Sequence, residues 1–325
     1  MRFDVINTQK QLTDEALNIL KAADCRVRFV ELVKLSSDEM CREIAGADGV
    51  VAGSEPYTAR VFAAADRLKV IARTGVGVDQ IDLTSATQQG VFVTNTPAAT
   101  NGAVAEFTIG VILCLLRGIP AMADAMKAGR WHPVRGRELG NMTLGVVGAG
   151  GIGKRVISLA RSFGTKVLAY DIHRDEQVAA KWNFEYVSLE ELMQRSDIVT
   201  IHCGLDDSTR GLIGQRQLDL MKKDAYLVNT ARPHIVDSDA LARKLANREI
   251  TGAAIDVHDP APCHPNDVLV SLDNVLPTSW SAYNTCEAIA DMSRRAAEDL
   301  VAVLSGREPR HLVNRSVMQT ALVNR

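Results

Sequence analysis

One stretch in the middle of the chain constrains its fold more than any other. Leu144 to Gly153 reads L-G-V-V-G-A-G-G-I-G, so an apolar run leads into three glycines spaced G-x-G-x-x-G, and the helical segment Lys154–Phe163 follows. In a strand–turn–helix unit the first glycine permits a tight turn, and the second lets the backbone approach a pyrophosphate. The third lets the helix pack closely on the strand. The pattern predicts an α/β unit that binds a dinucleotide.

An acidic residue indicates which dinucleotide binds. Asp171 ends the next predicted strand, V-L-A-Y-D, 171 − 148 = 23 residues after Gly148. A carboxylate there accepts hydrogen bonds from the ribose hydroxyls and repels a 2′-phosphate, so NAD is favoured over NADP. Arg174 lies nearby and weakens that preference slightly. The predicted NAD-binding residues of this region are Gly148, Gly150, Gly151, Ile152, Gly153 and Asp171.

Short apolar runs alternate with helical patterns along the rest of the chain. This alternation predicts parallel sheets covered by helices on both faces, and 325 residues suffice for two domains. We therefore predict an α/β fold with two doubly wound parallel-sheet domains. The predicted strands are Phe3–Ile6, Arg26–Val30, Gly49–Val51, Val70–Ala72, Val91–Thr94, Thr143–Val147, Lys166–Tyr170, Ile198–His202, Tyr226–Val228, Ala253–Val257 and Asn274–Leu276.

A long helical stretch, Gly102–Ala128, has no strand partner and carries apolar residues on more than one face. It is a candidate subunit interface of a homodimer, and the alternative is a helix buried between the two domains. A last helix, about Thr285 to Leu304, precedes Gly306, which is placed as a C-cap glycine.

Composition excludes several classes of protein. The 37 basic and 39 acidic residues give 37 − 39 = −2, which lacks the basic field that non-specific nucleic-acid binding needs. The most apolar run, Ile109–Leu116, is far shorter than the ~20 residues of a membrane span, and no signal region follows Met1. Six dispersed cysteines without a C-x-x-C pair indicate reduced thiols, and no cluster has metal-ligand spacing. We expect a cytoplasmic protein without a metal.

Several ordered motifs give the chain a resemblance to the D-2-hydroxyacid dehydrogenase family, which includes phosphoglycerate dehydrogenase and formate dehydrogenase. The resemblance covers nearly the whole length. Its motifs outside the fingerprint are R-T-G-V-G-V-D-Q-I-D (73–82), V-T-N-T-P (93–97), V-A-E-F-T (104–108), T-R-G-L-I-G (209–214), M-K-K-D-A-Y-L-V-N-T-A-R (221–232), V-D-S-D-A-L (236–241) and G-A-A-I-D-V (252–257).

The resemblance implies a division of labour between the domains. Residues 1–98 with 290–325 would form a flavodoxin-like substrate domain, and residues 99–289 would form an inserted Rossmann domain that binds NAD. A small carboxylated substrate would lie in the cleft, with its carboxylate on the backbone N–H groups of Val76 and Gly77. The alternative for Val76-Gly77 is a plain tight turn.

The resemblance also implies roles for residues after the fingerprint. Arg232 would clamp the substrate carboxylate and carbonyl, since a guanidinium matches carboxylate geometry and stays charged. Its alternative is a surface salt bridge. Asp256 would hold the nicotinamide carboxamide, with helix capping as its alternative. The remaining residues expected on the cofactor side are His202, Thr230 and Ala231.

The family pattern breaks at the acid–base pair. Hydride transfer between an alcohol and NAD also moves a proton, usually through a His beside a carboxylate. Here Ala261 stands where the resemblance expects the Glu, and Trp280 where it expects the His. Neither side chain exchanges protons at neutral pH. Pro233-His234 also replaces a usual glycine pair beside Arg232.

Other residues are candidates for the missing role. His258 and His234 lie two residues past Asp256 and Arg232 respectively, and each has a hydrogen-bonded structural role as its alternative. Tyr283 is a weaker candidate because its ordinary pKa is about 10. Asp259 would orient His258 only if the loop folds back. Trp280 would form an apolar wall over the nicotinamide or substrate, or else fill the core.

Two functions from different classes remain open. The first is an NAD-dependent oxidoreductase of a small 2-hydroxy or 2-keto carboxylate with non-standard acid–base machinery. An NAD enzyme with a different reaction is its alternative within the enzyme class. The second is a catalytically retired NAD-binding regulator or scaffold. Fold alone does not separate them, because function resides in the site.

Overall fold

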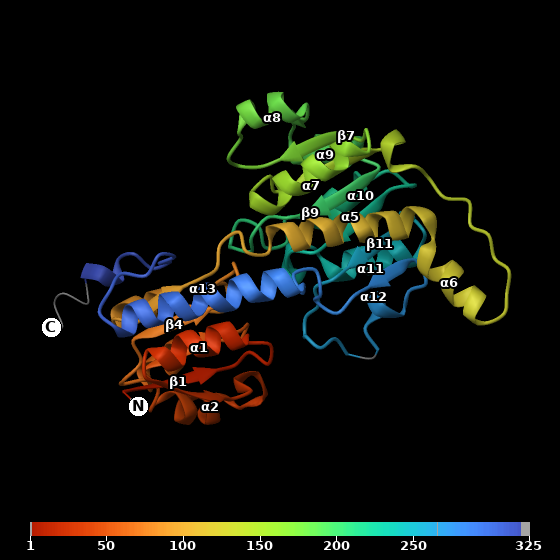
Figure 1. Cartoon of the computed structure of the whole chain (residues 1–325). Helices are drawn as coiled ribbons and strands as arrows, with labels where there is room; N and C mark the ends of the chain where they lie inside the picture. Colours follow the sequence, from red (N-terminus) through yellow and green to blue (C-terminus); the bar gives the residue numbers. More distant parts are fainter. Residues whose placement is uncertain (1, 265, 320–325) are drawn as a thin grey trace. The chain divides into compact units, whose positions relative to one another are not determined.

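The chain forms two compact units in a computed structural model that describes residues 2–264 and 266–319. Unit 1 comprises Met1–Thr100 with Asn284–Arg325, and unit 2 comprises Asn101–Tyr283. Each unit has one sheet whose strands all run parallel, with helices on both faces (Figure 1). The predicted α/β fold class is thereby confirmed. The borders predicted after residues 98 and 289 lie close to these, and the roles given to the two domains remain predictions.

Unit 1 contains a five-stranded sheet in the order β2-β1-β3-β4-β5. This order reverses direction between β1 and β3, as in flavodoxin-like folds. Most residues of β1, β3, β4 and β5 are buried, which accounts for the apolar runs in the sequence, whereas the edge strand β2 is only partly buried. The strands are β1 (Phe3–Asn7), β2 (Cys25–Phe29), β3 (Gly49–Ala52), β4 (Val70–Arg73) and β5 (Phe92–Thr94).

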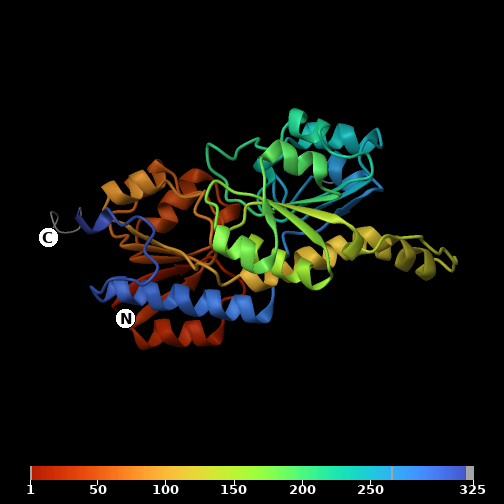
Figure 2. The ribbon, with the colours of Figure 1, turned by 90° about the horizontal axis from the view of Figure 1, so that it is seen from above.

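Helices from both ends of the chain cover one face of this sheet. In Figures 1 and 2, α1 (Asp14–Ala22, red) and α13 (Cys286–Leu304, blue) run side by side, and Leu20 and Leu300 belong to their shared core. Thr285 caps α13 by accepting a hydrogen bond from the Ala288 N–H. The opposite face carries α2 (Ser37–Ile44), α3 (Ala59–Ala63) and α4 (Leu83–Gln88), with a 3-10 turn at Leu32–Lys34.

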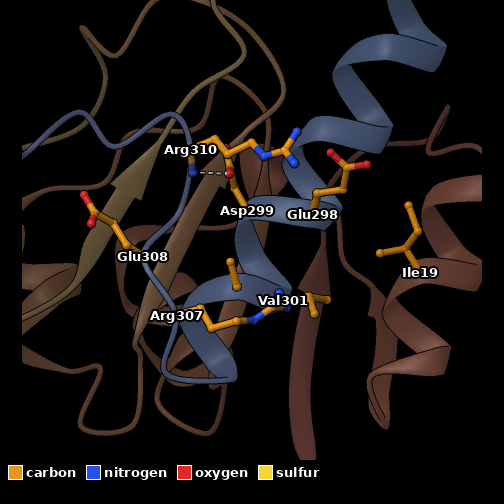
Figure 3. A pocket seen from close by; sticks show the side chains of 8 residues that line it. Ile19, Glu298, Asp299, Val301, Arg307, Glu308 and Arg310 are labelled. Atoms are coloured by element: carbon orange, nitrogen blue, oxygen red, sulfur yellow. Dashed lines mark hydrogen bonds between the residues drawn. The ribbon is translucent and has the colours of Figure 1, made fainter.

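The segment after α13 is tied to unit 1 by buried polar groups. The carboxylate of Asp299 accepts hydrogen bonds from the Arg310 N–H and from His311 Nδ1, each at 2.8 Å, beside the hollow drawn in Figure 3. The buried Asn314 accepts from the Val93 N–H at 2.8 Å. These contacts explain how the C-terminal residues belong to the same unit as the N-terminal strands.

Unit 2 contains a seven-stranded sheet in the order β12-β11-β10-β9-β6-β7-β8. The sequence analysis missed β8, which has only two residues and no apolar run. The strands are β6 (Thr143–Val147), β7 (Lys166–Tyr170), β8 (Glu185–Tyr186), β9 (Ile198–Ile201), β10 (Tyr226–Asn229), β11 (Gly252–Ile255) and β12 (Val275–Pro277).

Two helical layers enclose this sheet. One core joins α5 (Asn101–Arg117), α7 (Gly151–Ser162) and α8 (Glu176–Trp182), with Ile112 and Ile157 fully buried between helix and strand. The other core lies under α9 (Leu189–Arg195), α10 (Gln215–Asp219) and α11 (Ser238–Ala246). The short helix α12 (Val268–Ser271) and 3-10 turns at Leu139–Asn141 and Pro233–Ile235 complete the unit.

The single helix predicted over Gly102–Ala128 is wrong. α5 ends at Arg117, and α6 (Ile119–Lys127) continues at an angle of 65°. Gly118 makes the break with φ 60°, a left-handed conformation that favours glycine, and a proline lies in the first turn of α6. A Cβ on Gly118 would lie 2.9 Å from the Val134 side chain. Among the described residues no single helix is long and apolar enough to cross a membrane, and only the bent α5–α6 pair reaches that length and composition.

Candidate active site

The candidate site lies at the carboxyl-terminal edge of the unit 2 sheet. Because the strands are parallel, the residues that follow β6, β7, β9, β10, β11 and β12 all emerge at this one edge. From β6 the strands β7 and β8 follow toward one edge strand of the sheet. From β9 the strands β10, β11 and β12 follow toward the opposite edge strand, so the direction reverses between β6 and β9. Ligands of open α/β sheets bind at such a switch point.

The three glycines have the geometry that a pyrophosphate needs. Gly148 has φ 93°, and a Cβ there would lie 2.4 Å from the Cys203 backbone nitrogen. A Cβ on Gly153 would lie 2.0 Å from the Gly148 carbonyl oxygen, so helix and turn touch directly. A Cβ on Gly150, by contrast, would have no described atom within 4 Å. The backbone is therefore open on the side of Gly150, where a phosphate would approach.

The helix after the turn begins three residues earlier than the predicted Lys154. α7 starts at Gly151 with Gly150 as its N-cap residue, and no side chain caps it. The N–H groups of Gly151, Ile152 and Gly153 thus form the uncapped first turn, where the helix dipole favours an anion. Backbone donors at a helix start are the partners that phosphate oxygens bind.

Asp171 lies directly beside this turn. Its Oδ2 accepts from the Ala149 N–H at 2.7 Å, and its Oδ1 accepts from the His173 N–H at 2.8 Å. Each carboxylate oxygen keeps a further lone pair for a ribose hydroxyl. Ile172 follows with 75% of its surface exposed, an apolar side chain at the same edge that sequence analysis did not single out.

Arg174 is directed to other partners in unit 2. Its guanidinium lies 5.9 Å from the Tyr186 ring centroid, and Nη2 donates to the Val187 carbonyl at 3.5 Å. Lys154 is likewise paired, with Nζ 2.7 Å from Asp175 Oδ2, and this contact raises the pKa of the lysine. The charge of Lys154 is thus balanced by Asp175, while the Arg174 guanidinium contacts the uncharged Tyr186 ring and Val187 carbonyl.

His202 follows β9 next to the glycine turn. Its Nε2 lies 2.9 Å from Thr200 Oγ1, while Nδ1 is buried and has no hydrogen-bond partner among the described residues. Burial lowers the pKa of His202 to about 3, so the ring is neutral. A neutral ring with an unused nitrogen beside Gly148 suits contact with a bound dinucleotide and not proton transfer at neutral pH.

The turn after β10 is held by one amide side chain. Asn229 Oδ1 accepts from the Ala231 N–H at 3.0 Å, and Nδ2 donates to the Arg232 carbonyl at 2.9 Å. Thr230 Oγ1 lies 3.2 Å from Thr108 Oγ1 of α5. Arg232 is half-buried, and its Nη1 donates to the Ala231 carbonyl at 2.8 Å. The importance of Asn229 was missed, although its place before T-A-R was visible in the sequence.

Asp256 holds the loop that follows β12. This carboxylate is 2% exposed, and it accepts hydrogen bonds from Thr278 Oγ1 at 2.6 Å, the Ser281 N–H at 2.8 Å and the Ala282 N–H at 2.9 Å. Within unit 2 the residue therefore acts as an internal anchor. Contact with a carboxamide remains a prediction.

The two positions where the resemblance leads us to expect the acid–base pair differ in their surroundings. Ala261 is exposed in the loop after β11. Trp280 is half-buried in the loop held by Asp256, with φ 55°. Its backbone N–H donates to the Asp256 carbonyl at 2.8 Å. A left-handed conformation is uncommon for a bulky residue, and it persists here because hydrogen bonds fix the backbone around it.

The histidines at this edge have separate partners. His258 Nε2 lies 2.8 Å from the Thr278 carbonyl oxygen, which links the loops after β11 and β12. The carboxylate of Asp259 pairs with His234, whose Nε2 lies 2.8 Å from Asp259 Oδ2. The sequence showed both residues, but their pairing depends on two loops 25 residues apart. Tyr283 is half-buried at the end of unit 2.

The predicted carboxylate-binding turn belongs to unit 1. Val76 and Gly77 follow β4, and Val76 is exposed. The Val76 carbonyl accepts from Asn95 Nδ2 at 2.7 Å, so the turn is fixed to the segment after β5. In the part of the chain that the structure describes, no group of three or more His, Cys, Asp or Glu residues could hold a metal.

The comparisons with known proteins agree with this geometry. Residues 109–282 match the D-isomer specific 2-hydroxyacid dehydrogenase, NAD binding domain. The chain is 40% identical over 292 residues to a glyoxylate reductase of Thermofilum pendens, covering 87% of this chain and 86% of that protein. It is 38% identical to a D-3-phosphoglycerate dehydrogenase of Methanocaldococcus jannaschii, covering 93% of this chain and 58% of the longer relative.

A solved structure extends the likeness to the whole fold. The TT0316 protein from Thermus thermophilus is 34% identical and superposes with a TM-score of 0.88, over 95% of this chain and 99% of that one. With the open glycine turn, the uncapped start of α7 and Asp171 in place, the residues fit NAD. The chain belongs to the D-isomer specific 2-hydroxyacid dehydrogenase family of NAD-dependent oxidoreductases that act on CH–OH groups.

Proposed function

We propose that this protein interconverts a small 2-keto carboxylate and its 2-hydroxy acid with NAD, using acid–base machinery that differs from the family pattern. Bound NADH supplies the hydride to the carbonyl carbon. The observation that supports the proposal most is the ordered sheet edge of unit 2, where Gly150, Asp171, His202 and Arg232 follow four different strands. Gly150, Asp171 and His202 would hold the dinucleotide, and Arg232 would hold the substrate.

Arg232 is the proposed anchor of the substrate carboxylate. Asn229 accepts from the Ala231 N–H and donates to the Arg232 carbonyl, which fixes the turn from which the Arg232 side chain extends. The fork of an arginine forms two parallel hydrogen bonds with a carboxylate and stays charged at all working pH values. The amides of Val76 and Gly77 are proposed as a second set of donors, because consecutive backbone N–H groups in a turn attract anions.

Asp171 is proposed to select NAD over NADP through the ribose hydroxyls. Thr230, Ala231, Asp256 and Trp280 are proposed to line the nicotinamide end, with the Trp280 ring as an apolar wall that excludes water. The relatives are named for glyoxylate and phosphoglycerate chemistry, which supports a short carboxylate as the substrate class.

A retired NAD-binding regulator is the second candidate, and Ala261 and Trp280 favour it because neither moves a proton. The two functions differ in turnover. Purified protein would be mixed with NADH and a panel of 2-keto acids that includes glyoxylate, pyruvate and hydroxypyruvate, and nicotinamide absorbance would be followed across pH. We expect oxidation of NADH with at least one acid, and its loss in Arg232→Ala while NADH binding by calorimetry persists. Saturable binding without turnover on any acid would support the regulator.

A homodimer is the proposed assembly, supported by exposed apolar side chains on one segment of unit 2. α6 and the extended residues 128–138 project from the core of unit 2 (Figure 1). Met126 is 55% exposed and Trp131 84% exposed, which is unusual for large apolar side chains. Light scattering would give the mass of two chains for the wild type, and of one chain for Met126→Glu with Trp131→Glu. An unchanged mass would reject this interface. The cytoplasmic location remains a prediction.

A further inference from the structure

The loss of the family's acid–base residues coincides with a new pair at the same sheet edge. His234 follows β10 and Asp259 follows β11, and these strands are neighbours in the sheet. His234 Nε2 and Asp259 Oδ2 lie 2.8 Å apart. A histidine whose one nitrogen meets a carboxylate is the arrangement that general acid–base catalysis uses most often.

The backbone places His234 beside the proposed carboxylate anchor. It lies two residues after Arg232, in the 3-10 turn Pro233–Ile235. Its carbonyl accepts from the Gly211 N–H at 2.8 Å, and the next residue, Ile235, is fully buried. The backbone is therefore fixed while 42% of the His234 side chain stays exposed, as a ring that meets both substrate and solvent must be.

His258 and His202, which follow β11 and β9 at this edge, have different surroundings. The Thr278 carbonyl only accepts hydrogen bonds, so His258 Nε2 carries its hydrogen and joins two loops. His202 is neutral, because burial lowers its pKa to about 3. Among the described histidines of this edge, only His234 is paired with a carboxylate.

We propose that His234 is the proton carrier of this enzyme and that Asp259 is its positioning residue, replacing the pair lost at Trp280 and Ala261. This inference rests on the proposed function. When the keto acid is reduced, the carbon–oxygen π bond opens and the oxygen takes a proton from protonated His234. The ring becomes neutral and regains a proton from solvent. Since Asp259 accepts from Nε2–H, Nδ1 is the nitrogen that exchanges the proton.

Asp259 orients the ring and selects its tautomer, and it does not itself exchange the proton. The reverse reaction runs through the same atoms, with neutral His234 Nδ1 accepting the hydroxyl proton. The exposed position of the pair gives the ring direct access to water between turnovers.

Substitutions at the two histidines separate the alternatives. His234→Gln is expected to lower kcat by about 100-fold or more, the usual contribution of a general acid–base group, with KM and NADH affinity little changed. Added imidazole should restore part of the rate to His234→Ala. Asp259→Asn should lower kcat less, with partial rescue by Asp259→Glu. His132→Gln, an exposed histidine of the 128–138 segment, is the matched control and should leave kcat unchanged.

A measurement without substrate tests the pair itself. Nitrogen NMR of the histidine rings in the ligand-free protein should show His234 with its hydrogen on Nε2, and a mixture of tautomers in Asp259→Asn. Circular dichroism would confirm that each variant is folded.

The outcomes distinguish this inference from the proposed function. If the wild type turns over a keto acid and His234→Gln retains its rate while His258→Gln loses it, the proton carrier is wrongly assigned and the proposed function stands. If the wild type binds NADH but turns over no acid, the proposed function falls and this inference falls with it.

Discussion

The backbone N–H of Trp280 donates to the Asp256 carbonyl at 2.8 Å, while the Asp256 carboxylate accepts from the backbone N–H groups of Ser281 and Ala282, the next two residues. One residue thus holds both sides of position 280, where the resemblance to the family predicts a histidine. The loop after β12 keeps its shape through a buried carboxylate, whatever side chain stands at position 280.

Removing this carboxylate should therefore destabilise the fold. Asp256→Ala leaves a hydroxyl and two backbone N–H groups without their acceptor. We expect it to lower the free energy of unfolding by about 3 kcal/mol, since each hydrogen bond to a charged group contributes about 1.5–3 kcal/mol. Asp256→Asn keeps one acceptor oxygen and should lose less. Urea unfolding at neutral pH measures both. Asp273→Ala, an exposed carboxylate paired with Arg248, is the control. If Asp256→Ala has the same urea midpoint as the wild type, other contacts hold the loop.

Short sequence patterns predicted most of the fold because the strands and turns they specify depend mainly on neighbouring residues. The apolar strand β6 and the three glycines restrict the backbone conformation whatever surrounds them. The same reasoning failed at Gly118, where apolar residues continue on both sides and conceal the break. Hydrophobic periodicity shows which face of a helix is buried, but it does not show where a helix changes direction.

The site was less predictable because its contacts join distant loops. The approach of Asp259 to His234 depends on β10 and β11 being neighbours, and the bond from His258 to Thr278 depends on the loop after β12. Sequence spacing suggested that Asp259 would serve His258, if any histidine. Asn229 was overlooked because its side chain acts on backbone atoms only two and three residues away, which leaves no pattern in residue types.

Cofactor choice should depend on Asp171. Asp171→Ser removes the charge that repels a 2′-phosphate and two strong acceptors for ribose hydroxyls. We expect the NADH affinity to fall about 10-fold or more, the equivalent of one charged hydrogen bond, while the NADPH affinity rises. Calorimetric titration with each coenzyme gives the ratio. If the variant keeps the wild-type preference, selection lies elsewhere at this edge.

The dependence of folding stability on pH between about pH 5 and 6.5 should reflect the half-buried His202. Its pKa is about 3 in the folded chain and 6.5 ordinarily, so in this window the unfolded chain binds a proton that the folded chain does not. By linkage, the group's contribution favours folding above the unfolded pKa and is lost as pH falls. His202→Asn should flatten the rise of stability with pH by up to about 1.4 kcal/mol per pH unit. Urea unfolding at a series of pH values tests this, with His132→Asn as control. If the free energy of unfolding changes with pH equally in the wild type and in His202→Asn, the ring of His202 takes up the proton in the folded protein.

Two alanine substitutions, three residues apart, should separate cofactor binding from folding. In Gly153→Ala the new methyl group would lie 2.0 Å from the Gly148 carbonyl oxygen, a backbone atom that cannot move away freely. We expect the free energy of unfolding to fall by about 2 kcal/mol or more, as overpacking does. In Gly150→Ala the methyl group would meet no described atom within 4 Å, and φ −75° suits alanine. Its unfolding free energy should change by less than about 1 kcal/mol, the scale of an N-cap substitution.

The methyl group of Gly150→Ala would nevertheless occupy the open side of the turn, where the pyrophosphate is expected. NADH affinity should therefore fall about 10-fold or more, the loss of at least about 1.4 kcal/mol, in a protein that unfolds like the wild type. Calorimetry and urea unfolding on the same preparations measure the two effects. If Gly150→Ala binds NADH normally, the phosphates do not approach the start of α7, and the assignment of Gly151, Ile152 and Gly153 as their donors must be abandoned. Weak binding in Gly153→Ala alone would not rescue it, because that variant perturbs the turn before any ligand arrives.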